Sequence, residues 1–397
     1  MLAVSRPGER AAVQGDFITP NSERLVPYSA RNNLITSGCV LLPSDVGDFR
    51  DKGDLVDEVR AFLHRYVDLS PLFEELAAYY VLLSWVNDAF NELPYLRFRG
   101  DYGTGKTRAL LTVGSVCYKP FFASGASTVS PIFHILDAFQ GTLVLDEADF
   151  RFSDVTADLT KILNNGNMQG LPVLRTMANR HKELNPQAFR VFGPKLIAMR
   201  ESFADRALES RFLTEETGKR PLRPDISIHL PDSLKADALL LRNKLLAWRF
   251  HARSIVAPDP SRLIIGVEPR MNQTALALLS LIDDEALRGR VADELSGAEA
   301  LLKDERADSE EGRVVRSLIE AFAAIATPNV PLVEVARCFN DRAAELSDLP
   351  VTNKWLGWII RTRLRIATTK SNGIYVIPQR ERTKVEVLAA RYGLTRA

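Results

Sequence analysis

The sequence GDYGTGKT at residues 100–107 is the feature that most restricts how this chain can fold. It follows a short apolar segment, residues 95–100, and precedes residues 107–116, which are typical of a helix. A glycine-rich turn between a strand and a helix is characteristic of proteins in which helices connect parallel strands. Predicted strands and helices continue to alternate up to Asp146, so we expect an α/β fold with a parallel sheet and crossover helices.

The same eight residues match the phosphate-binding pattern G-x-x-x-x-G-K-[ST]. In this pattern the glycines let backbone N–H groups close around phosphate oxygens, the lysine reaches the β- and γ-phosphates, and the hydroxyl binds Mg²⁺. The alternative is a glycine-rich turn that arose by chance, but it leaves the flanking strand and helix unexplained. We therefore predict a site for ATP and Mg²⁺, with the nucleotide contacts Gly100, Asp101, Tyr102, Gly103, Thr104, Gly105, Lys106 and Thr107.

A pair of acidic residues follows a second apolar strand. Residues 142–145 lead directly into Asp146 and Glu147. We expect this strand to lie beside the strand that precedes the glycine-rich turn, so that its carboxyl end faces the phosphates. Asp146 would then hold Mg²⁺ with Thr107, and Glu147 would act as general base on the attacking water. The alternative is that the carboxylates only cap the next helix, since a helix N-terminus favours negative charge.

The two segments GDYGTGKT and LVLDEAD resemble those of the AAA+ ATPases, and more closely those of the phage- and plasmid-borne ATPases related to superfamily III helicases. Weaker similarity, including ADRALESRFL at residues 204–213, extends from about residue 72 to the C-terminus. The resemblance implies an AAA+-like core, a helical lid and ATP hydrolysis by a ring of identical subunits, which we expect to be hexameric. It also implies movement along DNA.

A hairpin is predicted between residues 173–177 and residues 188–193, with a polar stretch between these two β-type runs. Its tip carries three basic residues, Arg180, His181 and Lys182. In the related helicases such a hairpin projects into the central pore and grips single-stranded DNA. A solvated turn with incidental charge is the alternative. The next strand ends at Arg200, which the resemblance makes a candidate for the sensor residue of the family.

Three further arginines are assigned by the resemblance. Arg206 or Arg211 would reach across a subunit boundary to the γ-phosphate held by a neighbour, where a planar and permanently charged guanidinium stabilises the transferred group. A surface ion pair with a nearby carboxylate is the alternative for either residue. Arg270, at the start of a predicted helix, resembles the second sensor of the lid and would contact the nucleotide.

The chain is predicted to have four parts. Residues 1–52 are rich in turn formers around one β-type run, LITSGCVLL, and form a leader layer. Residues 53–215 form the ATPase core, beginning with helices in residues 55–90, and residues 216–305 form the helical lid. Residues 306–397 read as three helices followed by a hairpin with a Ser-Asn-Gly turn, which is the plan of a winged helix.

The net charge of +1 over 397 residues hides a basic C-terminus. Residues 350–397 contain ten basic and two acidic residues, a net charge of +8, which leaves −7 for the other 349. With a predicted winged helix, this charge indicates phosphate contacts to duplex DNA, for which Arg361, Arg363 and Lys370 are the candidates. The alternative is a solvated basic helix end that its own dipole favours.

Several protein classes are not expected. The three cysteines lie far apart, without the spacing of a zinc site or a disulfide framework. No run approaches the roughly 18 apolar residues of a membrane span, and the N-terminus has no apolar export segment, so we expect a cytoplasmic protein. The sequence favours a replicative helicase of a mobile element. A DNA-binding initiator or loader, or an AAA+ ATPase that remodels proteins in defence or transposition, remains as the alternative.

Overall fold

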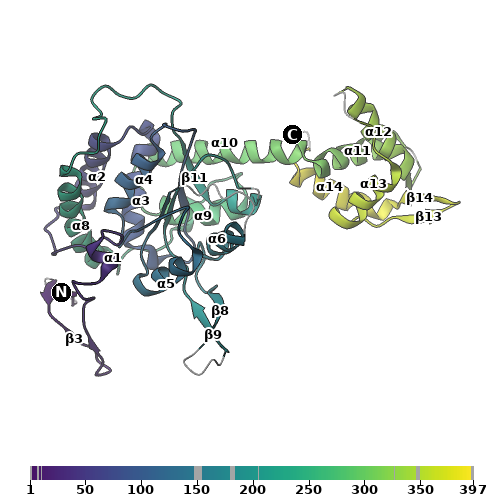
Figure 1. The fold of residues 1–397 in the computed structure, drawn as a ribbon. Coiled ribbons are helices and arrows are strands. Elements are labelled where there is room, and N and C mark those ends of the chain that lie inside the picture. Colours follow the sequence, from purple (N-terminus) through teal and green to yellow (C-terminus); the bar gives the residue numbers. More distant parts are fainter. Residues whose placement is uncertain are drawn as a thin grey trace. The chain divides into compact units, whose positions relative to one another are not determined.

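The computed structural model describes residues 2–6, 9, 11–146, 154–178, 184–203, 205–325, 327–345 and 349–394, without the side chains of 154–157, 178 and 206. The chain divides into two compact units, residues 1–292 and residues 293–397. Figure 1 labels many of their helices and strands. Among the described residues, no helix is both long enough and apolar enough to cross a membrane.

The first unit is built on a sheet of five parallel strands, which confirms the predicted α/β class with a parallel sheet. The order of the strands is β11-β5-β10-β7-β6. Their bounds are Tyr95–Arg99 for β5, Phe121–Ser124 for β6, Leu143–Asp146 for β7, Lys195–Met199 for β10 and Phe212–Glu216 for β11.

One expectation about this sheet is wrong. The strand that ends at Asp146, β7, does not lie beside β5, because β10 lies between them and is hydrogen-bonded to both. All five residues of β10 are buried, including the apolar run Leu196–Met199. A strand that is apolar on both faces is most stable in the interior of a sheet that helices cover on both sides.

Helices cover both faces of the sheet. One face carries α4 (Lys106–Val116), with α3 (Pro71–Trp85), α2 (Lys52–Tyr66) and α8 (Ser233–Ala252) packed around it. A Cβ on Gly114 of α4 would lie 2.9 Å from Cγ1 of Val144, so this helix needs a glycine where it crosses β7. Arg242 of α8 donates to the Ser115 carbonyl in the last turn of α4 at 2.6 Å.

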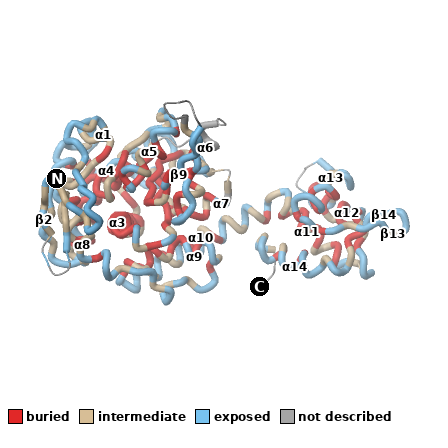
Figure 2. The backbone as a smooth tube through the Cα atoms, turned by 90° about the horizontal axis from the view of Figure 1, so that it is seen from below, coloured by how far each residue is buried: buried red, intermediate tan, exposed pale blue. Residues whose placement is uncertain are grey.

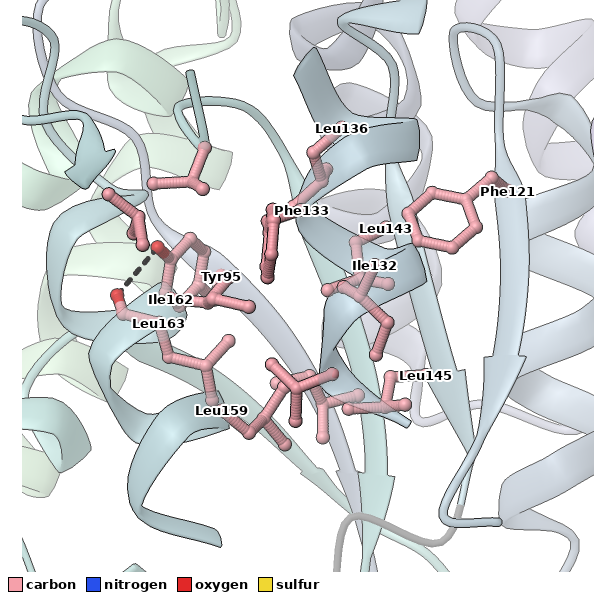
Figure 3. Packing of buried hydrophobic residues seen from close by; sticks show 14 of the residues in the cluster. Tyr95, Phe121, Ile132, Phe133, Leu136, Leu143, Leu145, Leu159, Ile162 and Leu163 are labelled. Atoms are coloured by element: carbon pink, nitrogen blue, oxygen red, sulfur yellow. Dashed lines mark hydrogen bonds between the residues drawn. The ribbon is translucent and has the colours of Figure 1, made fainter. Parts of the chain in front are cut away.

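The opposite face carries α5 (Val129–Phe139) and α6 (Asp154–Asn165). Leu143 and Leu145, which flank Val144 in β7, point to this side because side chains alternate along a strand. They join Phe133 of α5 and Leu163 of α6 in one buried cluster (Figure 3). Within it the Tyr95 hydroxyl donates to the carbonyl of Leu163 at 2.8 Å.

The leader differs from the prediction. The run LITSGCVLL is not a strand, because Leu34 and its neighbours form a short helix, α1 (Asn33–Thr36), whose N-terminus the Asn32 side chain caps. Only Val40 of this run makes a β-bridge, to Phe121 at the edge of the sheet. Two small antiparallel pairs precede it, β1 (Leu2–Val4) with β2 (Ala12–Gln14) and β3 (Phe17–Ile18) with β4 (Arg24–Leu25).

The predicted hairpin is present between α6 and β10, and it projects from the body of the unit (Figure 1). It consists of β8 (Val173–Ala178) and β9 (Leu184–Phe189), so its second strand begins earlier than predicted. The basic tip, Arg180, His181 and Lys182, lies outside the described residues, as does Glu147. The hairpin is therefore observed up to the residues that flank its tip.

The region after β11 is helical, as expected. After α8 come a short 3-10 helix, η2 (Pro260–Arg262), and α9 (Pro269–Leu279). Next is α10 (Glu285–Asp308), which runs across the division between the two units. The helical sequence over residues 271–302 is split because Asp284 caps α10, accepting from the Ala286 N–H at 2.8 Å.

The second unit contains α11 (Glu310–Ala324), α12 (Leu332–Glu345) and α13 (Asn353–Trp358), followed by a π-helical turn, η3 (Ile359–Arg363). A three-stranded antiparallel sheet, β12-β14-β13, packs with them. Its strands are Val330–Pro331, Thr369–Ser371 and Ile374–Ile377, and α14 (Arg382–Arg391) ends the unit. The unit has an apolar core of its own, centred on α11 and α12 (Figure 2).

Candidate functional site

The glycine loop, residues 100–105, lies at the carboxyl end of β5 and leads directly into α4. Gly103 and Gly105 have φ values of 74° and 89°, which side chains with a Cβ rarely adopt. A Cβ on either of them would meet nothing within 4 Å, so the space beside the loop is open. Gly105 is also the N-cap residue of α4, and no side chain caps this helix terminus.

Contacts behind the loop hold it against β11. A Cβ on Gly100 would lie 2.6 Å from the Thr217 carbonyl, so only glycine fits where the loop leaves the sheet. The hydroxyls of Thr104 and Thr217 lie 2.8 Å apart, and the Thr217 N–H donates to the carbonyl of Arg99 at 2.7 Å. Thr217 follows the last residue of β11, so two neighbouring strands position the loop.

Charged side chains surround the loop at this edge. Lys106, the first residue of α4, is half-buried and donates from Nζ to the Asp101 carbonyl. Arg200, which follows β10, hydrogen-bonds to the Tyr102 hydroxyl, and its guanidinium carbon lies 4.3 Å from the centre of the Tyr102 ring. Asp146 ends β7 at the same edge of the sheet. The predicted loop, acidic strand and sensor candidate are thus brought to one edge.

The residues at this edge fit a nucleoside triphosphate with Mg²⁺. The first turn of α4 has no side-chain cap, so its N–H groups are available to an anion placed at the helix N-terminus. Thr107 is exposed in that turn. The described residues contain no cluster of three or more His, Cys, Asp or Glu side chains that would hold a metal ion by themselves. Mg²⁺ usually takes one or two protein ligands and completes its shell with phosphate and water.

The predicted finger arginines lie at the other end of the strands. Arg211 immediately precedes β11, and the helix that begins at Arg206, α7 (Arg206–Glu209), lies just before it. A buried ion pair holds α7 on the sheet, because Glu209 accepts two bonds from Arg97 of β5, at 2.6 and 2.7 Å. The side chain of Arg206 lies outside the described part of the structure.

Arg211 is itself buried and is hydrogen-bonded to the end of α6. Its Nη1 donates to the carbonyls of Leu163 and Asn164 at 3.2 and 2.8 Å, and to Asn164 Oδ1 at 2.7 Å. Burial lowers the pKa of Arg211. Asn164 in turn donates to Asp205, which precedes α7, at 2.8 Å. Arg211 therefore closes the C-terminus of α6 in this chain, and the finger assignment falls more naturally on Arg206.

Arg270 also lies at this amino edge and not beside the glycine loop of its own chain. It is exposed at the start of α9, and Gln273 on the same helix donates to Glu92, which lies just before β5. Burial raises the pKa of Glu92, and the positive charges of Arg211 and Arg270 oppose this shift. The structure thus does not bring Arg270 together with the predicted nucleotide contacts.

A buried lysine at this edge was not identified from the sequence. Lys195, the first residue of β10, has no exposed surface, and its Nζ donates to the carbonyls of Gly166, Val191 and Gly193 at 3.1, 2.9 and 3.0 Å. Nζ also lies 4.9 Å from the centre of the Tyr95 ring. Burial lowers the pKa of Lys195 to about 7. The only sequence signal is a lysine directly before an apolar run.

The predicted DNA contacts of the second unit differ in their surroundings. Arg361 and Lys370 are exposed and make no ion pair within the described residues, whereas Arg363 pairs with Glu310 and Glu311 of α11 at 3.1 and 2.8 Å. These carboxylates, Glu311 foremost, raise the pKa of Arg363. Arg363 is thus partly neutralised within the unit, whereas the other two cations are not.

A glycine loop between strand and helix, at the carboxyl edge of a five-stranded parallel sheet, defines an α/β fold of the P-loop class. No family model matches the chain, and no curated protein is significantly similar to it. Solved structures that match the chain include the C-terminal region of NrS-1, residues 305–718. That match has 14% identity and a TM-score of 0.42, and covers 92% of this chain and 82% of the other.

Two further solved structures illustrate the range of the matches. JCV helicase is 14% identical with a TM-score of 0.28, over 68% of this chain and 65% of the other. The Orc1 protein of Aeropyrum pernix, solved in complex with DNA, is 15% identical with a TM-score of 0.21, over 88% of this chain and 95% of the other.

Proposed function

We propose that this chain is a Mg²⁺-dependent ATPase that forms a ring and couples ATP hydrolysis to movement along DNA, as the replicative helicase of a mobile element. The observation that carries the proposal is the open glycine loop at an uncapped helix N-terminus, with Thr107, Asp146 and Arg200 at the same edge of the sheet. Bound Mg²⁺ would neutralise phosphate charge, held by Thr107 and Asp146. Glu147, which follows Asp146, would take a proton from the attacking water.

The position of the arginines supports a ring. A strand of five residues spans about 16 Å, so α7 and Arg270, near the amino edge, lie far from the glycine loop of their own chain. From this edge, an arginine that the fold of its own chain does not occupy would reach a nucleotide held by a second copy. In such a ring, Arg206 would stabilise the transferred phosphoryl group of the neighbour, and the tip residues Arg180, His181 and Lys182 would contact single-stranded DNA in the pore.

The second unit supports a DNA partner. Its order of elements is helix, short strand, two helices and a two-stranded hairpin, which is the order of a winged helix. Exposed cations on η3 and on the hairpin, Arg361 and Lys370, would contact the phosphates of duplex DNA. This basic unit also favours the second candidate, a DNA-binding initiator or loader whose ATPase is a switch without unwinding.

The test compares ATP hydrolysis without DNA, with single-stranded DNA and with duplex DNA, together with strand displacement on a forked duplex. We expect DNA to stimulate the wild type and Lys106→Ala to show no turnover. Glu147→Gln should bind ATP but hydrolyse it about 10²- to 10⁴-fold more slowly, because only the base is lost. Lys161→Ala, which removes an exposed lysine of α6, is the matched control.

Each outcome assigns a function. Stimulation with strand displacement supports the helicase, and stimulation without it supports the initiator. Hydrolysis that is indifferent to DNA would favour an ATPase that remodels proteins. Turnover by Lys106→Ala at the wild-type rate would contradict the nucleotide site itself.

A further inference from the structure

Two aromatic side chains of the second unit are exposed, Trp358 at 46% and Tyr375 at 52%. Each lies against an arginine: the guanidinium carbon of Arg363 is 5.1 Å from the Trp358 ring centre, and that of Arg361 is 5.8 Å from the Tyr375 ring centre. The two pairs differ in charge, because Arg363 is paired with carboxylates, whereas Arg361 donates to the Thr368 hydroxyl at 3.4 Å and makes no ion pair within the described residues. The positive charge of Arg361 beside Tyr375 is therefore not offset by a carboxylate of the described residues.

Tyr375 lies on a hairpin that places a second cation beside it. β13 and β14 are joined by a two-residue turn, Asn372-Gly373, both with positive φ, as tight hairpins require. Lys370 is the direct cross-strand partner of Tyr375, so the two side chains share one face of the hairpin. Arg361, Lys370 and Tyr375 together are called the hairpin surface here. The residues of β13 and β14 nearest the turn are exposed or half-buried (Figure 2), whereas Val376 and Ile377 at the other end of β14 are buried.

The chemistry of the hairpin surface selects a ligand. Two cations without ion pairs in the described residues attract an anionic partner. A contact to the backbone of intact duplex needs only the cations, because the bases are stacked inside the helix. An exposed ring between two cations is instead the arrangement that holds single-stranded nucleic acid, where a base stacks on the ring and phosphates contact the cations. An aromatic ring left in water gains free energy by such stacking.

We propose that the hairpin surface binds DNA where the duplex opens into single strands, with Tyr375 stacked on an unpaired base and Arg361 and Lys370 on the adjoining phosphates. This proposal rests on the proposed function, in which the second unit contacts DNA, and it specifies the structure of that DNA. The hairpin surface would distinguish forked DNA from intact duplex by the stacking of an unpaired base on Tyr375. The phosphate contacts alone would not distinguish the two DNAs.

The test measures binding of the full chain, without nucleotide, to a blunt duplex and to the same duplex with two unpaired arms, by fluorescence anisotropy at several salt concentrations. We expect Tyr375→Ala to weaken fork binding about 10-fold, through the loss of one stacked base, and to leave blunt-duplex binding and its salt dependence unchanged. Tyr375→Phe keeps the ring and should retain fork binding. Ile374→Ala is the matched control, since it removes an exposed apolar side chain at the same tip without removing a ring.

A charge variant tests whether the second unit binds DNA, and a spectroscopic probe tests whether Tyr375 stacks on an unpaired base. Lys370→Gln should weaken binding to both DNAs and flatten log K against log[salt] by about 0.9 on the duplex. With 2-aminopurine at the first unpaired position, binding should quench fluorescence for the wild type and Tyr375→Phe, and not for Tyr375→Ala. Fork binding and quenching by Tyr375→Ala at wild-type levels would overturn the stacking proposal while leaving DNA binding intact. An unchanged salt slope in Lys370→Gln and Arg361→Gln would remove DNA binding by this unit altogether.

Discussion

Both edges of the parallel sheet carry a lysine and an arginine, but the surroundings of these residues differ. At the carboxyl edge, Lys106 and Arg200 lie half-buried around an open glycine loop. At the amino edge, Lys195 and Arg211 are buried, and Nζ of Lys195 and Nη1 of Arg211 donate to backbone carbonyls. A cation whose donors the chain itself satisfies stabilises the fold, whereas a cation beside an open backbone loop is positioned for a ligand.

The largest expected effect is a loss of ATP turnover in Arg206→Ala that Arg211→Ala, five residues away, should replace with a loss of stability. Arg206→Ala should bind ATP, melt at the wild-type temperature and lose on the order of 10³-fold in turnover, because the charge that stabilises the transferred phosphoryl group is gone. Arg211→Ala should instead lower the melting temperature, because the buried end of α6 loses the hydrogen bonds that Arg211 donates to the carbonyl and the side chain of Asn164. Thermal unfolding and ATP turnover of the two purified variants give the comparison.

Mixing tests the trans geometry directly. Rings formed from Arg206→Ala and Lys106→Ala contain some interfaces with both parts intact, so activity should partly return. If subunit mixing is shown and no ratio restores turnover, the finger does not act across the boundary. If Arg206→Ala proves as unstable as Arg211→Ala, the distinction between the two arginines fails.

A smaller effect compares the two lysines. Lys195→Met should lose about 1–3 kcal/mol in the free energy of unfolding, because the buried carbonyls of Val191 and Gly193 lose the hydrogen bonds that Nζ of Lys195 donates. Lys106→Met should change this free energy by less than about 0.5 kcal/mol while losing turnover, because the residue lies at the surface of the glycine loop. Urea denaturation of both variants measures the difference. Equal stabilities would show that burial does not distinguish the two edges.

The smallest effect is a pH dependence. Burial lowers the pKa of Lys195 to about 7, whereas a lysine in an unfolded chain titrates near 10.4. Between these values the folded chain binds fewer protons than the unfolded chain, so the contribution of Lys195 to stability rises with pH and is constant below pH 7. The stability of the wild type relative to Lys195→Met should therefore rise by about 1 kcal/mol per unit from pH 7 to pH 9. A flat difference would place the pKa of Lys195 outside this window.

The carboxyl edge was predictable because its signals are local. The glycine loop, the preceding strand and the following helix occupy one continuous segment, and Asp146 follows directly from its own apolar strand. The amino edge was not predictable, since Glu92, Lys195 and Arg211 come together only through the strand order. Nothing in a run such as KLIAM says that its strand enters between β5 and β7.

One apolar run was expected to form a strand and instead begins with a helical turn. LITSGCVLL has the composition of a strand, but the Asn32 side chain accepts from the Leu34 N–H and begins a helical turn. In the second unit, the helices and the hairpin could be predicted from the periodicity of the sequence. The ion pairs of Arg363 with α11 could not, because they depend on how the elements pack.

The central position of β10 in the sheet fixes the distance between the base of the β8–β9 hairpin and the glycine loop. Its first residue, Lys195, is bonded to the base of the β8–β9 hairpin, and the residue after its last, Arg200, stacks on Tyr102 of the glycine loop. One strand of about 16 Å, hydrogen-bonded along both sides, therefore separates the hairpin base from the loop. Sliding of β10 along its own axis would break bonds to two neighbours at once. The spacing between hairpin and loop is thus as stiff as the sheet, and the loops at either end do not set it.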